Sequence, residues 1–260
     1  MGTRTRLALL GLIAVLIAPP ALADEALDGV LACMRANIPK SLQIKDVELT
    51  ATDRTGGTRD LRGRLYAMRE EERLQAMIKI GAPADLAGAA YLLREKEGGD
   101  EMYVYVPALR KVRRITGAGV DGALWGTDLS YGDLKQLNNA FSAGQTRLEG
   151  QGELAGRAVH HLALTPEAAE GTRFSLIKVW VDKQTCVSLR ADFLEGTNVR
   201  KRLEVDPASL RQSGSVWYAG EALMSDLQES TKTRLRVLGV SSGVDLPSRY
   251  FNPSMFYLGS

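Results

Sequence analysis

Most of this 260-residue chain consists of short stretches in which apolar and polar residues alternate, separated by tight turns. The stretches are rich in β-branched and aromatic residues, which is typical of strands, and Arg54-Thr55-Gly56-Gly57 has the composition of a hairpin turn. Because the connections are short, we predict a mainly β, antiparallel fold of about ten to eleven strands, not a βαβ fold. The candidate stretches, from which we expect the ten to eleven strands, lie at 47–53, 58–69, 73–80, 89–95, 103–106, 144–150, 156–164, 172–182, 186–195, 198–205, 214–227 and 231–241.

Two helices are predicted outside this strand pattern. Apolar residues recur at helical spacing in 25–38, and Pro39 ends that helix. Ser130, followed three residues later by Asp133, is a capping signal for a helix at 130–137. No internal repeat, low-complexity tract or linker is visible in the sequence, so we expect residues 24–260 to form one domain.

The first 23 residues have the pattern of an export signal. Arg4 and Arg6 precede an apolar run at 7–18, and Ala21-Leu22-Ala23 matches a cleavage site, so we expect cleavage after Ala23. The whole chain has 33 Lys and Arg against 31 Asp and Glu, and loss of the two signal arginines brings the net charge to zero. A neutral mature chain argues against a nucleic-acid partner.

Cys33 and Cys186 are the only cysteines. An even count in an exported chain favours a disulfide, which would tie the N-terminal helix to the strand that begins near Cys186. Two buried free thiols or two reactive thiols are the alternatives. A disulfide that closes a loop of about 150 residues would contribute about 4–5 kcal/mol in the chain-entropy model.

The stretch 103–134 holds the most distinctive features of the sequence. Its strand is interrupted at Pro107, and four cations follow: Arg110, Lys111, Arg113 and Arg114. These cations either keep a sheet edge from pairing with another sheet or bind a partner. A Gly-rich loop at 117–126 then carries Leu124 and Trp125, and Trp125 either fills its own core or lines and gates a ligand cavity.

The predicted strand at 172–182 is apolar on both faces. One face carries Phe174, Leu176 and Trp180, and the other carries Ile177, Val179 and Val181. Such a strand lies in the centre of a core, or is covered by a helix on one face and faces a cavity on the other; both interpretations remain open.

The sequence offers little for catalysis. His160 and His161 are the only histidines, and as neighbours on a strand they point to opposite faces and cannot hold one metal ion together. We find no nucleophile elbow, zinc, phosphate-loop or dinucleotide motif. We therefore expect a protein that is not an enzyme and that has no metal or cofactor.

The central stretch resembles the signature of the LolA-like family of outer-membrane lipoprotein-sorting proteins. The similar residues are Tyr105-Val106-Pro107-Ala108-Leu109-Arg110-Lys111-Val112-Arg113-Arg114-Ile115 and Gly126-Thr127-Asp128-Leu129-Ser130-Tyr131-Gly132-Asp133-Leu134. Weaker similarities follow at Trp180-Val181-Asp182-Lys183, Lys201-Arg202-Leu203, Thr231-Lys232-Thr233-Arg234-Leu235 and 251–258. The resemblance implies an unclosed antiparallel β-barrel with covering helices and an apolar cavity between them.

The same resemblance implies a function. We expect a periplasmic carrier for the acyl chains of a lipid or lipoprotein, monomeric and working with an inner-membrane transporter of the resistance-nodulation-division (RND) type. The expected cavity residues are Tyr105, Leu109, Leu124, Trp125, Tyr131, Phe174, Leu176 and Trp180. The expected partner-binding residues are Arg110, Lys111, Arg113 and Arg114. The alternative is an adaptor that docks to the transporter without carrying cargo.

Overall fold

The computed structural model describes residues 20–137, 146–167, 171–243 and 248–258. Within them the chain forms two α-helices, α1 (Pro20–Ala36) and α2 (Asp133–Leu137). The strands are β1 (Gln43–Thr52), β2 (Thr58–Glu70), β3 (Arg73–Ala82), β4 (Ala90–Arg94), β5 (Glu101–Val106), β6 (Lys111–Ile115), β7 (Thr146–Leu154), β8 (Arg157–Leu164), β9 (Leu176–Asp182), β10 (Ser188–Glu195), β11 (Asn198–Val205), β12 (Leu210–Ser213), β13 (Val216–Ala219), β14 (Glu221–Asp226) and β15 (Thr231–Ser242). Short 3-10 turns are η1 (Pro107–Leu109), η2 (Gly117–Asp121), η4 (Pro207–Ser209), η5 (Ser248–Phe251) and η6 (Phe256–Leu258).

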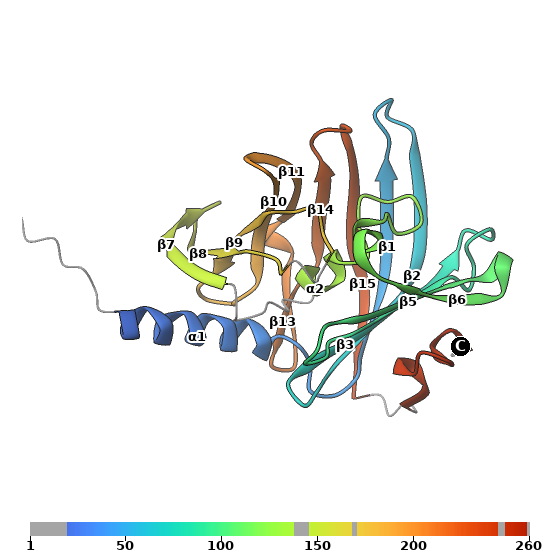
Figure 1. Cartoon of the computed structure of the whole chain (residues 1–260), viewed down its shortest axis with the longest axis horizontal. Helices are drawn as coiled ribbons and strands as arrows, with labels where there is room; N and C mark the ends of the chain where they lie inside the picture. The colour runs from blue at the N-terminus through green and yellow to red at the C-terminus, as the bar shows by residue number, and fades with distance from the viewer. Residues whose placement is uncertain (1–19, 138–145, 168–170, 244–247, 259–260) are drawn as a thin grey trace, which may run out of the picture.

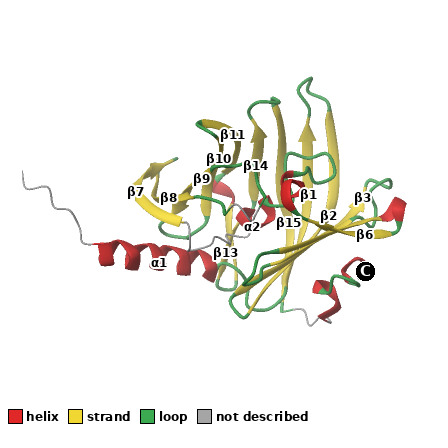
Figure 2. Cartoon of the chain, viewed as in Figure 1, coloured by secondary structure: helices red, strands yellow, loops and turns green. Residues whose placement is uncertain are grey.

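Thirteen of these strands form one antiparallel sheet, in the order β6-β5-β4-β3-β2-β1-β15-β14-β11-β10-β9-β8-β7. β1 pairs with β15, so the beginning and the end of the strand sequence meet inside the sheet (Figure 1). The two edge strands, β6 and β7, are not paired with each other, and the sheet therefore stays unclosed. Strands dominate over helices (Figure 2), and the predicted unclosed antiparallel fold is confirmed.

The structure contains more strands than the ten to eleven predicted. The predicted strand at 214–227 is divided at Gly220, whose amide donates to the Ser209 carbonyl over 2.9 Å. A Cβ at this glycine would lie 2.5 Å from the same oxygen, so the break depends on a close approach of two backbones. β12 and β13 consequently pair as a separate two-stranded sheet.

The N-terminal helix was predicted at 25–38 and lies at Pro20–Ala36. The second helix was predicted at 130–137 but begins only at Asp133, since Ser130 forms an isolated β-bridge with Ala123. The predicted capping signal is present, with the Ser130 amide donating to the Asp133 carboxylate over 2.7 Å.

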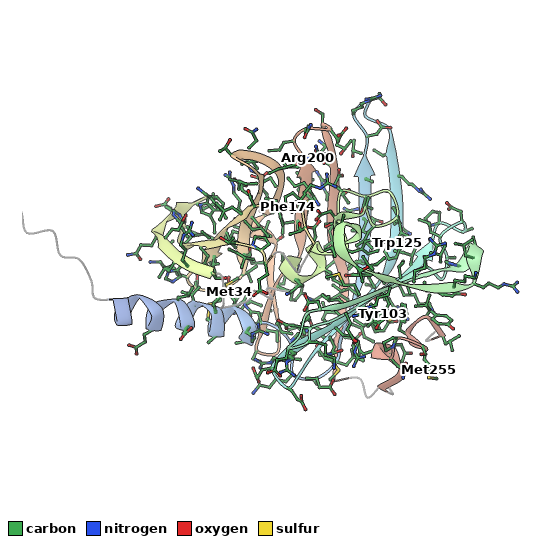
Figure 3. All side chains as sticks on the ribbon, in the orientation of Figure 1. Met34, Tyr103, Trp125, Phe174, Arg200 and Met255 are labelled. Atoms are coloured by element: carbon green, nitrogen blue, oxygen red, sulfur yellow. A yellow bond between two sulfur atoms is a disulfide. The ribbon has the colours of Figure 1, made fainter. Side chains whose placement is uncertain are left out.

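Both faces of the sheet are covered by apolar contacts. The inner face, as we call it, carries the larger core, which includes Leu61 and Ile78 and packs against α1 and residues 117–137. The outer face carries Tyr66, Met77 and Leu92, which pack against the C-terminal turns η5 and η6 beside β3 and β4. Figure 3 shows side chains filling the space on both sides of the ribbon.

The predicted disulfide is confirmed. Cys33 of α1 is bonded to Cys186, which lies in the turn between β9 and β10, and their Cα atoms are 5.8 Å apart. Asn37, just after α1, reinforces this junction by donating from its side chain to the Thr185 carbonyl over 2.7 Å. The helix is therefore fixed to the β9–β10 end of the sheet both covalently and by a buried hydrogen bond.

The predicted export signal occupies residues 1–23, of which 1–19 lie outside the described residues. In the part of the chain that the structure describes, no helix combines the length and the apolar character needed to cross a membrane.

Candidate functional site

Residues 117–137 cross the inner face of the sheet, and we call them the crossing segment. It consists of η2, a loop and the single turn-and-a-half of α2, drawn in green in front of β1 and β15 (Figure 1). Leu124, Leu129 and Leu134 of this segment are all buried in the inner core. An irregular segment, not a long helix, therefore covers the central apolar part of the sheet.

A small cavity lies beneath the crossing segment. Its lining is apolar apart from Ser130, and comprises Val47, Leu49, Leu65, Ile78, Leu124, Trp125, Leu129, Ser130, Leu134 and Leu235. The free volume is about 10 Å³, which is barely enough for one water molecule. In this conformation Leu124 and Trp125 thus fill space that the strands would otherwise leave open.

Trp125 has an unusual backbone conformation. Its φ of 50° is in the left-handed region, as is the 79° of Gly126. A non-glycine residue pays about 1 kcal/mol or more for this conformation and keeps it only where its surroundings enforce it. The enforcing contacts are local: Leu124 donates to the Leu129 carbonyl over 2.7 Å, and the Thr127 hydroxyl donates to the Leu124 carbonyl over 2.7 Å.

Asp128 anchors the crossing segment to β15. Its carboxylate accepts hydrogen bonds from the hydroxyls of Thr231 and of Thr233, the latter over 2.7 Å. The Asp128 amide in turn donates to the Thr233 hydroxyl over 2.8 Å. Three polar contacts therefore attach the loop that carries Trp125 to the centre of the sheet.

Two further anchors hold the end of the segment. The Tyr91 hydroxyl of β4 donates to the Tyr131 carbonyl over 2.6 Å, and burial raises the pKa of Tyr91 well above its ordinary value, which keeps the donor protonated. Lys201 of β11 donates to the Asp133 carboxylate over 2.6 Å, and both side chains are buried. Since a buried ion pair is costly to break, this contact defines one fixed end of the segment.

A larger cleft of about 570 Å³ opens beside the crossing segment. Its apolar wall includes Met102, Ile115, Leu164, Phe174, Ile177 and Phe193. Its polar wall includes Glu95, Asp100, Asp121, Asp133 and Lys135, with Lys135 and Asp100 paired over 2.9 Å. The Phe174 and Phe193 rings pack at 5.3 Å, and Figure 3 labels Phe174 and Trp125 in the two regions. The cleft thus combines an apolar surface with charged groups at its rim.

Charged groups at the rim are mostly paired. Glu95 accepts from Arg35 of α1 over 3.1 Å and from the Leu74 amide over 2.8 Å. Burial opposes ionisation of Glu95, but these hydrogen bonds outweigh it and hold the pKa of the carboxyl below its usual value. This carboxylate therefore joins α1 to β3 as a structural link.

The structure brings only some of the predicted cavity residues together. Leu124, Trp125 and Phe174 line the inner cavity or the cleft, while Tyr131 packs on Tyr91 in the inner core. Leu109 lies in η1 and is 49% exposed, away from both spaces.

Three predicted cavity residues lie on the outer face. Tyr105 stacks on Tyr257 of the C-terminal turns, with ring centroids 4.0 Å apart. Trp180 is covered by the Arg190 guanidinium at 4.6 Å, and Leu176 shares its face. The physical reason is strand parity: Ile177, Val179 and Val181 occupy the inner core, so the alternate residues of β9 must face outward. The inner face of β9 is therefore buried in the core, and its outward face carries Leu176 and Trp180. Ile177, and not Leu176 or Trp180, lines the cleft.

The four predicted partner-binding cations lie on or next to the edge strand β6. β6 pairs with β5 on one side only, and its register places Lys111 and Arg113 beside Val106 and Val104, and Arg114 beside Tyr103. Lys111 and Arg113 thus share one face and Arg114 the other, while Arg110 occupies the preceding turn with a φ of 48°. None of the four forms an ion pair with a described residue, whereas most other arginines do.

Sequence reasoning missed Tyr91, Lys201, Thr231 and Thr233, because their partners are far away in the sequence. A signal was present for the threonines, which are polar residues on the face of β15 that also carries Leu235. No group of three or more His, Cys, Asp or Glu side chains in the described ranges is arranged to hold a metal ion.

Comparisons with known proteins agree with this fold. The model of a family described as uncharacterized protein matches residues 72–256, which is more than half of the chain. A DUF1329 family protein from Desulfovibrio piger has a similar structure, with 22% identity and a TM-score of 0.80 over 89% of this chain and 98% of that one. A domain assigned to outer membrane lipoprotein-sorting proteins, from Vibrio parahaemolyticus, has 21% identity and a TM-score of 0.79 over 90% and 99%. A LolA superfamily protein from Nitrosomonas europaea has 15% identity and a TM-score of 0.65 over 86% and 96%. Comparison with curated protein sequences gave no match.

Proposed function

The chain belongs to the family whose model matches residues 72–256, and from its LolA-like fold we propose that it is a periplasmic carrier of lipid or lipoprotein acyl chains. In this proposal residues 1–23 direct export and residues 24–260 act as one carrier unit. The observation that supports it best is the apolar cavity of the inner face, which Leu124 and Trp125 fill in this conformation.

Cargo must displace the crossing segment, because a free volume of about 10 Å³ cannot hold an acyl chain. Burying ten methylenes contributes about 8 kcal/mol, while exposing one Leu or Trp side chain costs about 2–3 kcal/mol. An acyl chain can therefore replace Leu124 and Trp125 against the sheet with a favourable balance. The left-handed backbone at Trp125 favours the same exchange, since its strain is released when the loop moves.

The cleft beside the crossing segment is the proposed entry. Its apolar wall, from Met102 to Phe193, gives an acyl chain a surface that continues into the inner core. Its charged rim keeps the opening hydrated while the cavity is closed. No residue of the site is assigned a catalytic role, because a carrier needs only shape and apolar surface.

Tryptophan fluorescence tests the movement. In a variant with Trp180→Phe and Trp217→Phe, the emission of Trp125 should shift and its quencher accessibility should change when a C16 lipid is added. A matched variant that keeps only Trp180 should show no change, because Trp180 lies on the outer face under Arg190. Unchanged emission and quenching of Trp125 during demonstrated lipid binding would show that Trp125 is a fixed core residue.

The second candidate function is a non-carrier adaptor for an inner-membrane transporter of the RND type. The specific observation is the unpaired cationic edge formed by Arg110, Lys111, Arg113 and Arg114. In an adaptor, charge reversal at Lys111 and Arg113 should abolish association with inner-membrane vesicles, and an organic extract of the purified protein should contain no lipid by mass spectrometry. A carrier should yield a bound lipid in that extract and keep its lipid affinity after the charge reversal.

A further inference from the structure

A second pocket on the inner face contains an unpaired buried charge. Lys45 of β1 is only 9% exposed, and among the described residues it has no carboxylate or hydrogen-bond acceptor. Its ammonium lies 4.9 Å from the centre of the Tyr218 ring. A neutral aromatic ring compensates a buried ammonium only in part, so Lys45 is an isolated cation in an apolar setting.

The pocket around Lys45 is small and well defined. It has a free volume of about 40 Å³, which is roughly the space of one or two small polar groups. Its wall includes Leu65, Leu203, Val205, Trp217, Tyr218 and Leu235. Asn37 holds one side in place by accepting from the Trp217 amide over 2.9 Å while donating to Thr185.

The other buried cation among the described residues is Lys201, also on the inner face, and it is paired with Asp133 at 2.6 Å. The partly buried Arg200 is paired with Asp226 at 3.0 Å. Among the described residues, Lys45 is therefore a buried charge that only the Tyr218 ring offsets, and only in part. A buried charge without a partner is explained most readily by a ligand that supplies the missing anion.

A second polar group at this end of β1 is also unsatisfied. Gln43 lies two residues before Lys45 on the same face of the strand and is 1% exposed. Its Oε1 accepts no hydrogen bond within the described part of the structure, although its amide nitrogen donates to Ser242 over 3.2 Å. The polar end of β1 thus has both a cation and an acceptor without partners.

The Lys45 pocket adjoins the cavity under the crossing segment: Leu65 and Leu235 line both spaces. We propose that Lys45 binds the anionic head group, a carboxylate or a phosphate, of a single-chain lipid whose acyl chain lies under Leu124 and Trp125. This inference rests on the proposed carrier function and gives its cargo a chemical class. It favours anionic amphiphiles over cargo whose polar end is neutral.

Three ligands with the same C16 chain test the proposal: palmitate, hexadecyl phosphate and hexadecanol. Each is titrated into delipidated full-length protein by displacement of a fluorescent acyl probe. At pH 7 the preferred anion should bind at least about tenfold more tightly than hexadecanol, as expected for one charge-assisted contact. The ratio of palmitate to hexadecyl phosphate affinity distinguishes a carboxylate site from a phosphate site.

Lys45→Met should remove this preference. Methionine keeps the length and apolar stem of the side chain, so the affinity for hexadecanol should stay within about twofold while that for the anion falls about tenfold. Lys45→Arg should keep most of the preference. Lys232→Met, which removes an exposed charge from β15, is the matched control and should leave all three affinities unchanged.

The outcomes separate the two proposals. An anion preference that persists in Lys45→Met, or that is absent from the wild-type protein while hexadecanol binds, overturns the role of Lys45 and leaves the carrier function standing. Failure of all three ligands to bind overturns both. Thermal unfolding of each variant establishes that it is folded, and Lys45→Met is expected to melt higher than the wild-type protein in the absence of lipid, because it removes an uncompensated buried charge.

Discussion

Lys45 and Lys201 are both buried lysines on the inner face of the sheet, but only Lys201 has a carboxylate partner. The difference is visible in their energetics. Burial lowers the pKa of Lys45 from 10.5 to about 8, so at neutral pH the side chain is still charged and destabilises the folded state. At the residue scale, Lys201 is thus a paired cation that holds the crossing segment, whereas Lys45 is a cation without an anionic partner among the described residues.

The stability of the lipid-free protein should depend on Lys45 in a defined way. Since the pKa is depressed on folding, the unfolded state binds more protons between pH 8 and 10.5, and stability rises with pH in that window. Lys45→Met should therefore stabilise the protein by about 1–3 kcal/mol at pH 7, with the gain vanishing above about pH 10.5. Tyr218 is the other titratable side chain in the pocket lining. Urea unfolding at pH 7, 9 and 10.5 measures the difference, and a constant gap would contradict the assignment.

Asp128 should be worth more than an ordinary surface carboxylate. Asp128→Ala leaves the hydroxyls of Thr231 and Thr233 without their acceptor, at an expected cost of about 1–3 kcal/mol. Asp60→Ala is the matched control, because Asp60 also accepts from a threonine, Thr50, but at an exposed position, and it should cost less than about 1 kcal/mol. Because Asp128 anchors the loop that carries Trp125, quenching of Trp125 should also increase in Asp128→Ala. An equal loss of unfolding free energy in the two variants would show that Asp128 does not anchor the crossing segment.

At the scale of single elements, β6 shows how a local signal can have two meanings. Its cations lie along a sheet edge, where charge prevents pairing with another sheet. None of them forms an ion pair with a described residue, which leaves them available to a partner. The turn at η1, with Arg110 in the left-handed region, lets the chain reverse direction after Pro107 and return as a strand. Most of the predicted partner-binding cations thus lie on a strand, and their charge is divided between its two faces.

The disulfide is the strongest single link between elements. It joins α1 to the β9–β10 turn across a sequence separation of 153 residues. Replacement of Cys33 and Cys186 by serine should lower the free energy of unfolding by about 2–5 kcal/mol, because the unfolded chain gains conformational freedom. Chemical denaturation under non-reducing conditions measures the change, and the wild-type protein under reducing conditions should show the same loss. A loss in the reduced wild type that differs from that of the double variant would indicate that the serines act on packing instead.

At the scale of the whole molecule, one sheet separates two apolar layers. The inner layer contains both cavities and the cleft, whereas the outer layer joins Tyr66, Tyr105 and the C-terminal turns. The C-terminal turns lie against the outer side of β3 and β4 (Figure 1). In the proposed carrier, cargo therefore lies on the inner face, opposite the face that the C-terminal turns cover.

This separation predicts that stability and binding respond to different substitutions. Phe256→Ala removes a fully buried ring from the outer layer and should cost about 3–5 kcal/mol, with no change in acyl-probe affinity of the folded protein. Leu124→Ala, in the inner layer, should raise the affinity for the acyl probe, because cargo then displaces a smaller side chain. Denaturation and probe titration on both variants check this. A coupled change in both quantities for Phe256→Ala would mean that the layers are not independent.

How much of this could be predicted from the sequence depends on the range of the interactions involved. Strand alternation and hairpin turns are local, so the antiparallel class, the N-terminal helix and the capping contact between Ser130 and Asp133 were predicted correctly. The break at Gly220 was not, since it requires the backbone of Ser209 to approach from another segment. The cysteine pairing was favoured by the count alone, because only two cysteines were present.

The faces of the strands and the identity of the anchors were decided by the tertiary structure. Alternation states that Tyr105 and Val104 point in opposite directions, but it does not say which direction leads to the cavity; the packing of Tyr257 on Tyr105 and of Ile177 in the inner core does. The threonine partners of Asp128 and the lysine partner of Asp133 come from strands that are distant in the sequence. Lys45 has no hydrogen-bond acceptor and no carboxylate partner among the described residues. A sequence specifies the periodicity of each strand through local sterics, while the choice of face and of polar partner depends on how all the strands are arranged at once.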